Sequence, residues 1–284
     1  MTREFCTDRA IACGEPLAGT GAIAERHLFL VWPKTKWRRP RFESEGFTPE
    51  LTGAMRATSS AKSYVGLIAG DGEELELRSF PDNRHMTARD QSHLAEIILA
   101  WGRGEPLAGA SSNRRAILCC TDARTDACCA RYGFPLFKAL SSAAPSFDID
   151  ILQCTHIGGC HFAPSVIVMP NRHRYGRLSP TDVPAFLEAI SSEELYLPNY
   201  RGNPQLSEVE QAAELAAHLQ NSSANQSDVI VLGTEEAGEG AVVRLEVRGA
   251  PTEVRLQRTD FAIHSNCRNL DGPPKLVSRW LAEK

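Results

Sequence analysis

Short apolar stretches separated by turn residues dominate the first hundred positions of the chain. They predict strands at residues 27–32, 63–69 and 74–80, the last two joined by the turn signal at Asp71 and Gly72. Residues 90–102 predict a helix that ends near two glycines. Residues 1–22 lack periodicity and residues 33–58 are rich in proline, lysine and arginine, so both stretches are predicted to be loops.

A clearer alternation follows the glycine- and serine-rich stretch 104–113, which we take as a boundary. The predicted order is strand, helix, strand, strand, strand and helix. These elements are expected at 114–119, 126–142, 148–154, 165–170, 173–178 and 179–191. Ser179 and Pro180 are typical of a helix start. The order indicates a small α/β domain.

The C-terminal part predicts a helix at 207–220, whose first turn carries the capping-box pair Ser207 and Glu210. A strand, a hairpin and a short helix are expected at 228–232, 241–258 and near 274–282. The chain is therefore divided into three predicted regions. They are an N-terminal α/β region at 1–105, an α/β domain at 106–200 and a small C-terminal α+β extension at 201–284.

The composition is that of an ordinary globular protein, with 42% hydrophobic and 23% charged residues among 284. A net charge of −4 and a pI of about 6.1 argue against nucleic acid or a membrane surface as partner. No apolar run approaches the roughly 18–20 residues of a membrane helix, and the N-terminus lacks an apolar signal core. We therefore expect a soluble, cytoplasmic protein.

The distribution of the cysteines indicates a more specific function than the composition does, because six of the nine lie within residues 119–160. A disulfide framework would be even-numbered and spread along a secreted chain. Local clustering in a chain expected to be cytosolic indicates metal or redox chemistry instead. The nine are Cys6, Cys13, Cys119, Cys120, Cys128, Cys129, Cys154, Cys160 and Cys267.

Two segments carry the candidate chemistry, each where a predicted strand ends or a helix begins. Cys120 and Cys129 are nine positions apart, and His156 and Cys160 are four apart. Gly158 and Gly159 lie between the second pair and predict a tight backbone turn. Thiolates and imidazoles bind soft metals and iron–sulfur clusters. The spacing matches neither the common ferredoxins nor a zinc ribbon. Spacing alone therefore leaves three interpretations: a metal or cluster site, thiol redox chemistry, or buried structural cysteines.

These motifs resemble those of the sucrase/ferredoxin-like family, also called thioredoxin-like ferredoxins. The resemblance covers roughly residues 5–220 and is most specific at the segment that begins with His156. It is carried by Cys6-Thr-Asp, Gly14 through Thr20, Cys120 through Cys129, His156 through Ala163, Tyr175-Gly-Arg-Leu, Tyr200-Arg-Gly and Gln211-Ala-Ala-Glu. It implies an α/β fold in which residues 106–200 form a thioredoxin-like ferredoxin domain.

The resemblance also implies a 2Fe–2S cluster used for electron transfer. Many family members have histidine where this chain has Cys160, so three alternatives follow: Cys160 is a ligand, His161 is a ligand after a loop shift, or the cluster is absent. We expect Cys160, because it keeps the spacing. The expected cofactor-binding residues, which are also the metal ligands, are Cys120, Cys129, His156 and Cys160. Three cysteines and one histidine would make the oxidised site −1, between the Rieske and plant-ferredoxin types.

We therefore expect an electron carrier more than a self-contained enzyme. Its partner would be a redox protein or a small-molecule electron acceptor, with no nucleic acid and no membrane involved, and the oligomeric state is not indicated. The chain has no Gly-x-Gly-x-x-Gly fingerprint after a strand. The basic run Lys34 to Arg39 is either a docking patch for an acidic partner or a solvated loop. The alternatives from other classes are a thioredoxin-like thiol/disulfide enzyme and a structural zinc module.

Overall fold

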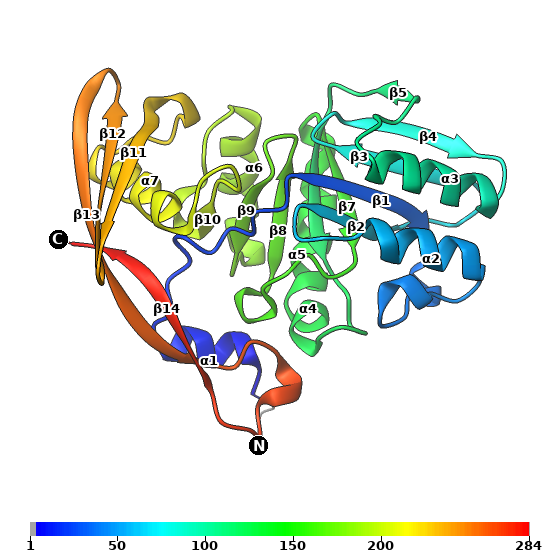
Figure 1. The fold of residues 1–284 in the computed structure, drawn as a ribbon, viewed down its shortest axis with the longest axis horizontal. Coiled ribbons are helices and arrows are strands. Elements are labelled where there is room, and N and C mark those ends of the chain that lie inside the picture. The colour runs from blue at the N-terminus through cyan, green and yellow to red at the C-terminus, as the bar shows by residue number, and fades with distance from the viewer. Residues whose placement is uncertain (1–3, 284) are drawn as a thin grey trace.

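A ten-stranded mixed sheet runs through the middle of the molecule (Figure 1). The computed structural model describes residues 4–283. In spatial order the strands are β10 (Tyr200–Gly202), β9 (His173–Gly176), β8 (Ser165–Met169), β6 (Arg115–Cys120), β7 (Ile149–Cys154), β2 (Ser63–Ala69), β1 (Arg26–Trp32), β3 (Leu75–Phe80), β4 (Arg84–Ala88) and β5 (Ala110–Ser111). The prediction of a mixed α/β protein is confirmed, and one sheet passes through both predicted regions 1–105 and 106–200.

The sheet consists of two halves that repeat one topology. In the first half β1 and β2 are parallel, and β3 and β4 follow as antiparallel neighbours on the other side of β1. In the second half β6 and β7 are parallel, and β8 and β9 follow in the same way. The helices are α2 (Pro49–Thr58) and α3 (Gln91–Gly102) in the first half, and α4 (Ala127–Arg131), α5 (Gly133–Ala143) and α6 (Val183–Ser191) in the second. The predicted order of elements in the second half is observed.

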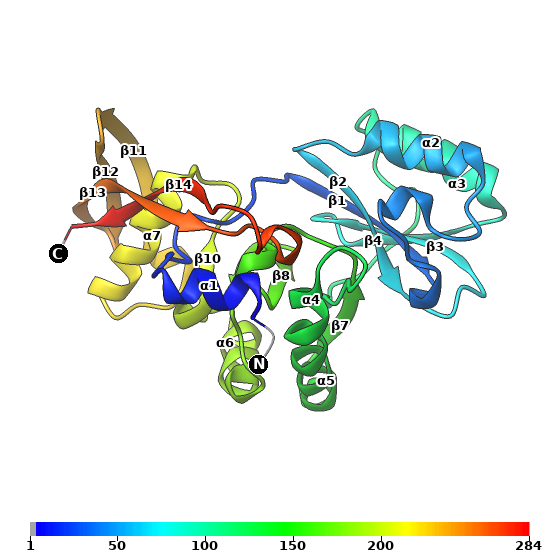
Figure 2. The same cartoon turned by 90° about the horizontal axis from the view of Figure 1, so that it is seen from below.

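Each half has its own hydrophobic core, and the helices of the two halves cover opposite faces of the sheet (Figure 2). The buried side chains of Trp37 and Trp101 belong to the first core, and those of Tyr175 and Phe186 to the second. Strand β6 is buried at nearly every position, as expected for a central strand covered on both faces. Among residues 4–283 no helix combines the length and apolar character needed to cross a membrane.

The two halves meet where β2 and β7 run antiparallel. The register pairs Ile68 with Cys154. One residue further along, the Thr155 N–H donates to the Leu67 carbonyl, and the Thr155 hydroxyl oxygen accepts from the Leu67 N–H, each at 2.9 Å. The first half therefore holds the chain in place as it leaves β7, directly before His156.

The C-terminal region forms a second, antiparallel sheet. Its strands are β11 (Val229–Ala237), β12 (Gly240–Val247), β13 (Ala250–Ile263) and β14 (Lys275–Ala282), and α7 (Glu208–Gln220) packs against them. Helix α7 begins at the predicted capping box, where Glu210 accepts the Ser207 N–H at 2.8 Å. The prediction of a short helix near 274–282 is wrong, since this segment forms strand β14. Leu276 and Trp280 are four positions apart, a spacing that fits one face of a helix or of a strand, and pairing with β13 decides between them.

Two predicted loops contain helices. Residues 1–22 include α1 (Cys6–Ala12), and residues 33–58 include α2. Both helices pack against parts of the chain that are remote in sequence, which local periodicity does not reveal.

The predicted helix 126–142 is two helices, because Tyr132 separates α4 from α5. Pro135 lacks the N–H that a continuous helix would need at this point. Gly133 begins α5 directly beneath the end of β6, where a Cβ atom would lie 2.1 Å from the carbonyl oxygen of Cys120. The break therefore lets the helical segment approach the strand that carries Cys120.

The burial of Glu214 on α7 makes the stability of the fold depend on pH. Glu214 is 6% exposed and its carboxyl group accepts the Tyr200 hydroxyl at 3.1 Å, and burial raises its pKa from 4.5 to about 7. The folded protein thus binds more protons than the unfolded chain between these two values. The contribution of Glu214 alone should therefore lower the free energy of unfolding by about 3 kcal/mol as pH rises from 4.5 to 7.

Replacing Glu214 with Gln should remove this contribution, so the free energy of unfolding of the variant, relative to wild type, should rise by about 3 kcal/mol between pH 4.5 and 7, as measured by urea unfolding at several pH values. Glu210→Gln on the same helix is the matched control, since the pKa of Glu210 is lowered and its contribution lies at more acidic pH. An unchanged slope in Glu214→Gln would contradict the assignment.

Candidate metal centre

The two predicted motifs meet at the carboxyl ends of β6 and β7. Cys120 ends β6 and lies opposite Cys154, which ends β7. His156 follows two residues later, and Cys129 lies on α4, which begins just beyond β6. Parallel neighbouring strands end at the same edge of a sheet, so the two loops leave the sheet side by side.

All four predicted site residues come together. The ligand atoms of Cys120, Cys129 and His156 lie within 4.8 Å of one another. The Cys160 sulfur, at the start of the 3-10 helix η4 (Cys160–Phe162), lies 3.4 Å from Nδ1 of His156 and also contacts Cys129. The three cysteines are at most 5% exposed, whereas His156 is half-buried. This group of sulfur and nitrogen donors could hold a metal.

Hydrogen bonds within this group shift the pKa values of its members in opposite directions. The bond with Cys129, followed by the contact with His156, lowers the pKa of Cys120 to about 6 and that of Cys160 to about 7. The same bonds raise the pKa of Cys129. Burial alone would lower the pKa of His156, but its bonds with the sulfurs of Cys120 and Cys160 outweigh burial and raise it to about 10. The four side chains therefore hold thiolate charge at this edge of the sheet.

A buried carboxylate, that of Asp122, ties the two loops together. Its Oδ1 accepts the backbone N–H groups of Arg124 at 3.0 Å and Thr125 at 3.2 Å. Its Oδ2 accepts the Thr125 hydroxyl at 2.7 Å and the His156 N–H at 3.2 Å. Asp122 is 1% exposed. It therefore fixes the backbone of both loops that carry the candidate ligands.

The glycines of the second motif have the turn conformation that the sequence predicts. Gly158 and Gly159 have φ values of +94° and +73°, in the region that side chains disfavour. A Cβ atom on Gly159 would also lie 2.9 Å from the guanidinium of Arg201. These two positions bring Cys160 back toward His156.

His161 points away from the other ligand candidates. Its Nε2 lies 3.4 Å from the buried Glu15 carboxylate, an ion-pair distance rather than a well-aligned hydrogen bond, and its Nδ1 lies 3.3 Å from the Ser265 carbonyl oxygen. Arg279 on β14 donates to the same carboxylate at 2.6 Å. His161 therefore joins segments from both ends of the chain.

The first half of the sheet also contributes side chains to the site. The Tyr64 hydroxyl donates to the His156 carbonyl oxygen at 2.5 Å. Lys34 donates to the Thr121 hydroxyl at 2.9 Å and to Gln153 at 2.7 Å, beneath the end of β6. Arg41 lies over the Tyr64 ring at 4.6 Å. Of the predicted basic run 34–39, Lys34 is thus a structural part of the site.

A cavity of about 440 Å³ opens at the half-buried side of the site. His156 and Cys160 line it, and Arg39, Arg41 and Arg268 provide a positively charged rim. This cavity gives a molecule in solution access to the His156 edge.

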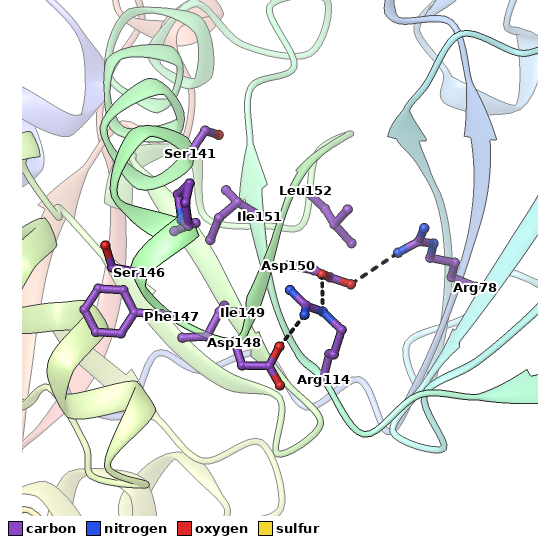
Figure 3. A pocket seen from close by; sticks show the side chains of 12 residues that line it. Arg78, Arg114, Ser141, Ser146, Phe147, Asp148, Ile149, Asp150, Ile151 and Leu152 are labelled. Atoms are coloured by element: carbon purple, nitrogen blue, oxygen red, sulfur yellow. Dashed lines mark hydrogen bonds and ion pairs between the residues drawn. The ribbon is translucent and has the colours of Figure 1, made fainter.

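A second cavity, of about 750 Å³, lies near the opposite ends of the same strands, by Ile149 (Figure 3). Its charged groups bind one another: Asp150 lies 2.8 Å from Arg114 and 3.7 Å from Arg78. Arg114 also pairs with Asp148. Because these charges are paired and remote from the cysteines, this cavity is not part of the metal centre.

The sequence prediction missed several residues that shape the site. Asp122 and Asp126 are visible in the sequence as turn-forming and helix-capping residues before a helix. Tyr64 has no local signal. The structure also gathers Cys6, Cys128 and Cys267, which the sequence alone does not connect. Cys119 and Cys154 are fully buried in the core.

The fold and the donor group define a mixed α/β protein with a cysteine-rich candidate metal site. The family model described as sucrase/ferredoxin-like matches residues 17–202, well over half of the chain. The chain therefore belongs to the sucrase/ferredoxin-like family.

Solved structures that resemble part of the chain include the thioredoxin-like [2Fe-2S] ferredoxin from Aquifex aeolicus, at 18% identity and a TM-score of 0.30, covering 32% of this chain and 94% of that one. A cysteine-to-serine variant of the same ferredoxin matches at 20% identity and a TM-score of 0.28, covering 30% and 96%. A search of curated proteins found no match. The family assignment rests on the family model alone.

Replacing Asp122 with Ala should destabilise the protein by at least about 2 kcal/mol, because four donors lose their acceptor, three of them backbone N–H groups of the two loops. Urea unfolding measures this loss. Asp122→Asn should fall between wild type and Ala, since an amide keeps one acceptor oxygen. Asp71→Ala, in an exposed turn, is the control. Equal stability of Asp122→Ala and wild type would show that the carboxylate does not hold the loops.

Proposed function

We propose that this chain binds a 2Fe–2S cluster through Cys120, Cys129, His156 and Cys160 and acts as an electron-transfer protein. The observation that carries the proposal is the meeting of three thiols and one imidazole at one sheet edge. Cysteine, with histidine in some proteins, is the ligand set of such clusters. Membership of the sucrase/ferredoxin-like family supports this assignment. When bound, the cluster would supply a redox couple that takes up and gives back one electron.

The arrangement favours Cys160 over His161 as the fourth ligand. Both ring nitrogens of His161 are directed at other partners, Glu15 and Ser265. The Cys160 sulfur instead lies beside His156 and Cys129. A shift of the loop to bring in His161 would also break its contact with Glu15.

The order of the second half, in which a strand–helix–strand unit precedes a hairpin and a helix, is that of a thioredoxin-like domain. In this interpretation the fold places the ligands at the strand ends, where a rigid sheet can position them. The protein chain excludes water from the three sulfurs by burial and leaves one edge, that of His156, accessible.

The accessible edge also suggests what the partner is like. Arg39, Arg41 and Arg268 around the cavity would attract an acidic protein surface or an anionic small molecule. Electrons would then pass through the His156 edge, the least buried part of the ligand set.

Anaerobically purified protein should contain two irons and two sulfides per chain and be red-brown, with visible bands that bleach on reduction. Cys120→Ala and Cys129→Ala should lose these bands. Cys13→Ala, which replaces an exposed thiol outside the donor group, should keep them. A colourless wild-type protein with zinc at this centre, or one with reversible thiol oxidation and no iron, would contradict the proposal and favour a zinc module or a thiol redox enzyme.

Cys160→His should raise the reduction potential by on the order of 100 mV, because a neutral imidazole replaces an anionic thiolate. It should also steepen the pH dependence, since a second ligand then titrates. Redox titration at several pH values measures both. His161→Gln is the matched control at the next position and should change the potential little. If Cys160→His changed neither the potential nor its pH slope, Cys160 would not be a ligand.

A further inference from the structure

A second group of cysteines surrounds Cys128, the residue that precedes Cys129 of the proposed cluster on α4. The sulfurs of Cys6 and Cys128 are 3.3 Å apart, those of Cys128 and Cys267 are 3.2 Å apart, and those of Cys267 and Cys6 are 3.6 Å apart. These residues come from α1, from α4 and from the 3-10 helix η8 (Cys267–Asn269), which follows β13. Figure 2 shows these three segments side by side although they span nearly the whole chain.

The carboxylate of Asp126 completes the group. One ligand atom from each of Cys6, Asp126, Cys128 and Cys267 lies within 4.8 Å of all the others. Oδ1 of Asp126 accepts the Cys128 N–H at 2.9 Å, and Oδ2 accepts the Cys267 N–H at 2.8 Å. Each carboxylate oxygen has a further lone pair for a metal, and the two N–H groups orient it.

Backbone N–H groups also point at the sulfurs. The Cys6 N–H donates to the Cys267 sulfur at 3.4 Å, and the Thr7 N–H is directed at the Cys128 sulfur. Cys6 and Cys128 are fully buried, and Cys267 is partly buried. Three thiols, a carboxylate and N–H donors to sulfur together form the kind of environment that stabilises metal-bound thiolate.

We propose that Cys6, Asp126, Cys128 and Cys267 form a structural zinc site, separate from the cluster. Zinc prefers four tetrahedral ligands, and a Zn–S distance of about 2.3 Å places the sulfurs about 3.8 Å apart, close to the observed spacings. The carboxylate in the donor set also favours zinc, which binds Asp as well as Cys, over an iron–sulfur cluster, whose ligands are cysteine and histidine. A disulfide would join only two of the three thiols, so it would not account for the third thiol or for the Asp126 carboxylate beside it.

The zinc site would join segments near both ends of the chain to α4, which also carries Cys129 of the proposed cluster. Cys128 and Cys129 are neighbours on α4, one in each site, and Cys6 and Cys267 are 261 positions apart in sequence. Ser265, Asn266 and Arg268, which flank Cys267, line the cavity beside His156. The zinc would therefore hold one wall of the proposed electron-transfer edge in place.

The test begins with the unaltered full-length protein, purified anaerobically without added metal. Elemental analysis should find about one zinc per chain in addition to iron. X-ray absorption at the zinc edge should show three sulfurs and one oxygen. No zinc, a disulfide among these cysteines, or zinc bound to a histidine nitrogen would overturn the proposal. Because this measurement needs no variant, it decides even where a variant fails to fold.

Variants then locate the zinc. Cys267→Ser and, separately, Cys6→Ser should lower the zinc content at least tenfold while the iron per chain stays at the wild-type level. Cys13→Ser, at the end of α1 and exposed, is the matched control and should retain both metals. Zinc retained in both site variants would overturn the assignment. Iron reports on the cluster and zinc on this site, so either proposal can fail alone.

Discussion

The site depends on the hydrogen bonds that the buried carboxylate of Asp122 accepts from two loops. Asp122 lies 34 positions from His156 in sequence, yet it accepts the His156 N–H as well as three donors of its own loop. A buried carboxylate is stable only when its lone pairs are used, and here four donors use them. The same bonds that make its burial tolerable therefore join the two motifs, and neither loop can move without leaving a buried charge short of partners.

The repeated topology shows how the two halves of the sheet differ: the second half carries the candidate metal site, and the first half supports it. In the second half the strand end after β6 carries Cys120. At the matching end of β1, the buried rings of Trp32 and Trp37 fill the space instead. The first half contributes its edge strand β2, whose pairing with β7 covers an edge that would otherwise be open to water. Tyr64 and Lys34 then reach across this junction to the ligand-bearing loops.

Local signals predicted much of the second half, including the strands β6 and β7, the helix α6, which follows a 3-10 turn (Pro180–Asp182) capped by Ser179, and the glycine turn before Cys160. These features depend on periodicity, capping and backbone freedom, which are properties of neighbouring residues. The grouping of the four site residues was predicted because strand ends and a family resemblance both indicate it. The strand β14, the helix α1 and the meeting of Cys6 with Cys267 depend on pairing between remote segments, which no local pattern encodes.

At position 160 this chain has cysteine where many family members have histidine, and the effect of this difference depends on the cations around the site. In the proposed cluster, a thiolate in place of an imidazole would add one negative charge, which by itself would make uptake of an electron less favourable. The ammonium of Lys34 interacts electrostatically with Cys120, and the buried guanidinium of Arg174 interacts with Cys154 and donates to the Ile157 carbonyl oxygen at 3.1 Å. Charges that are partly shielded from water act on one another more strongly than charges at the surface. If the proposed cluster is bound, these cations would offset part of the charge that a third thiolate adds.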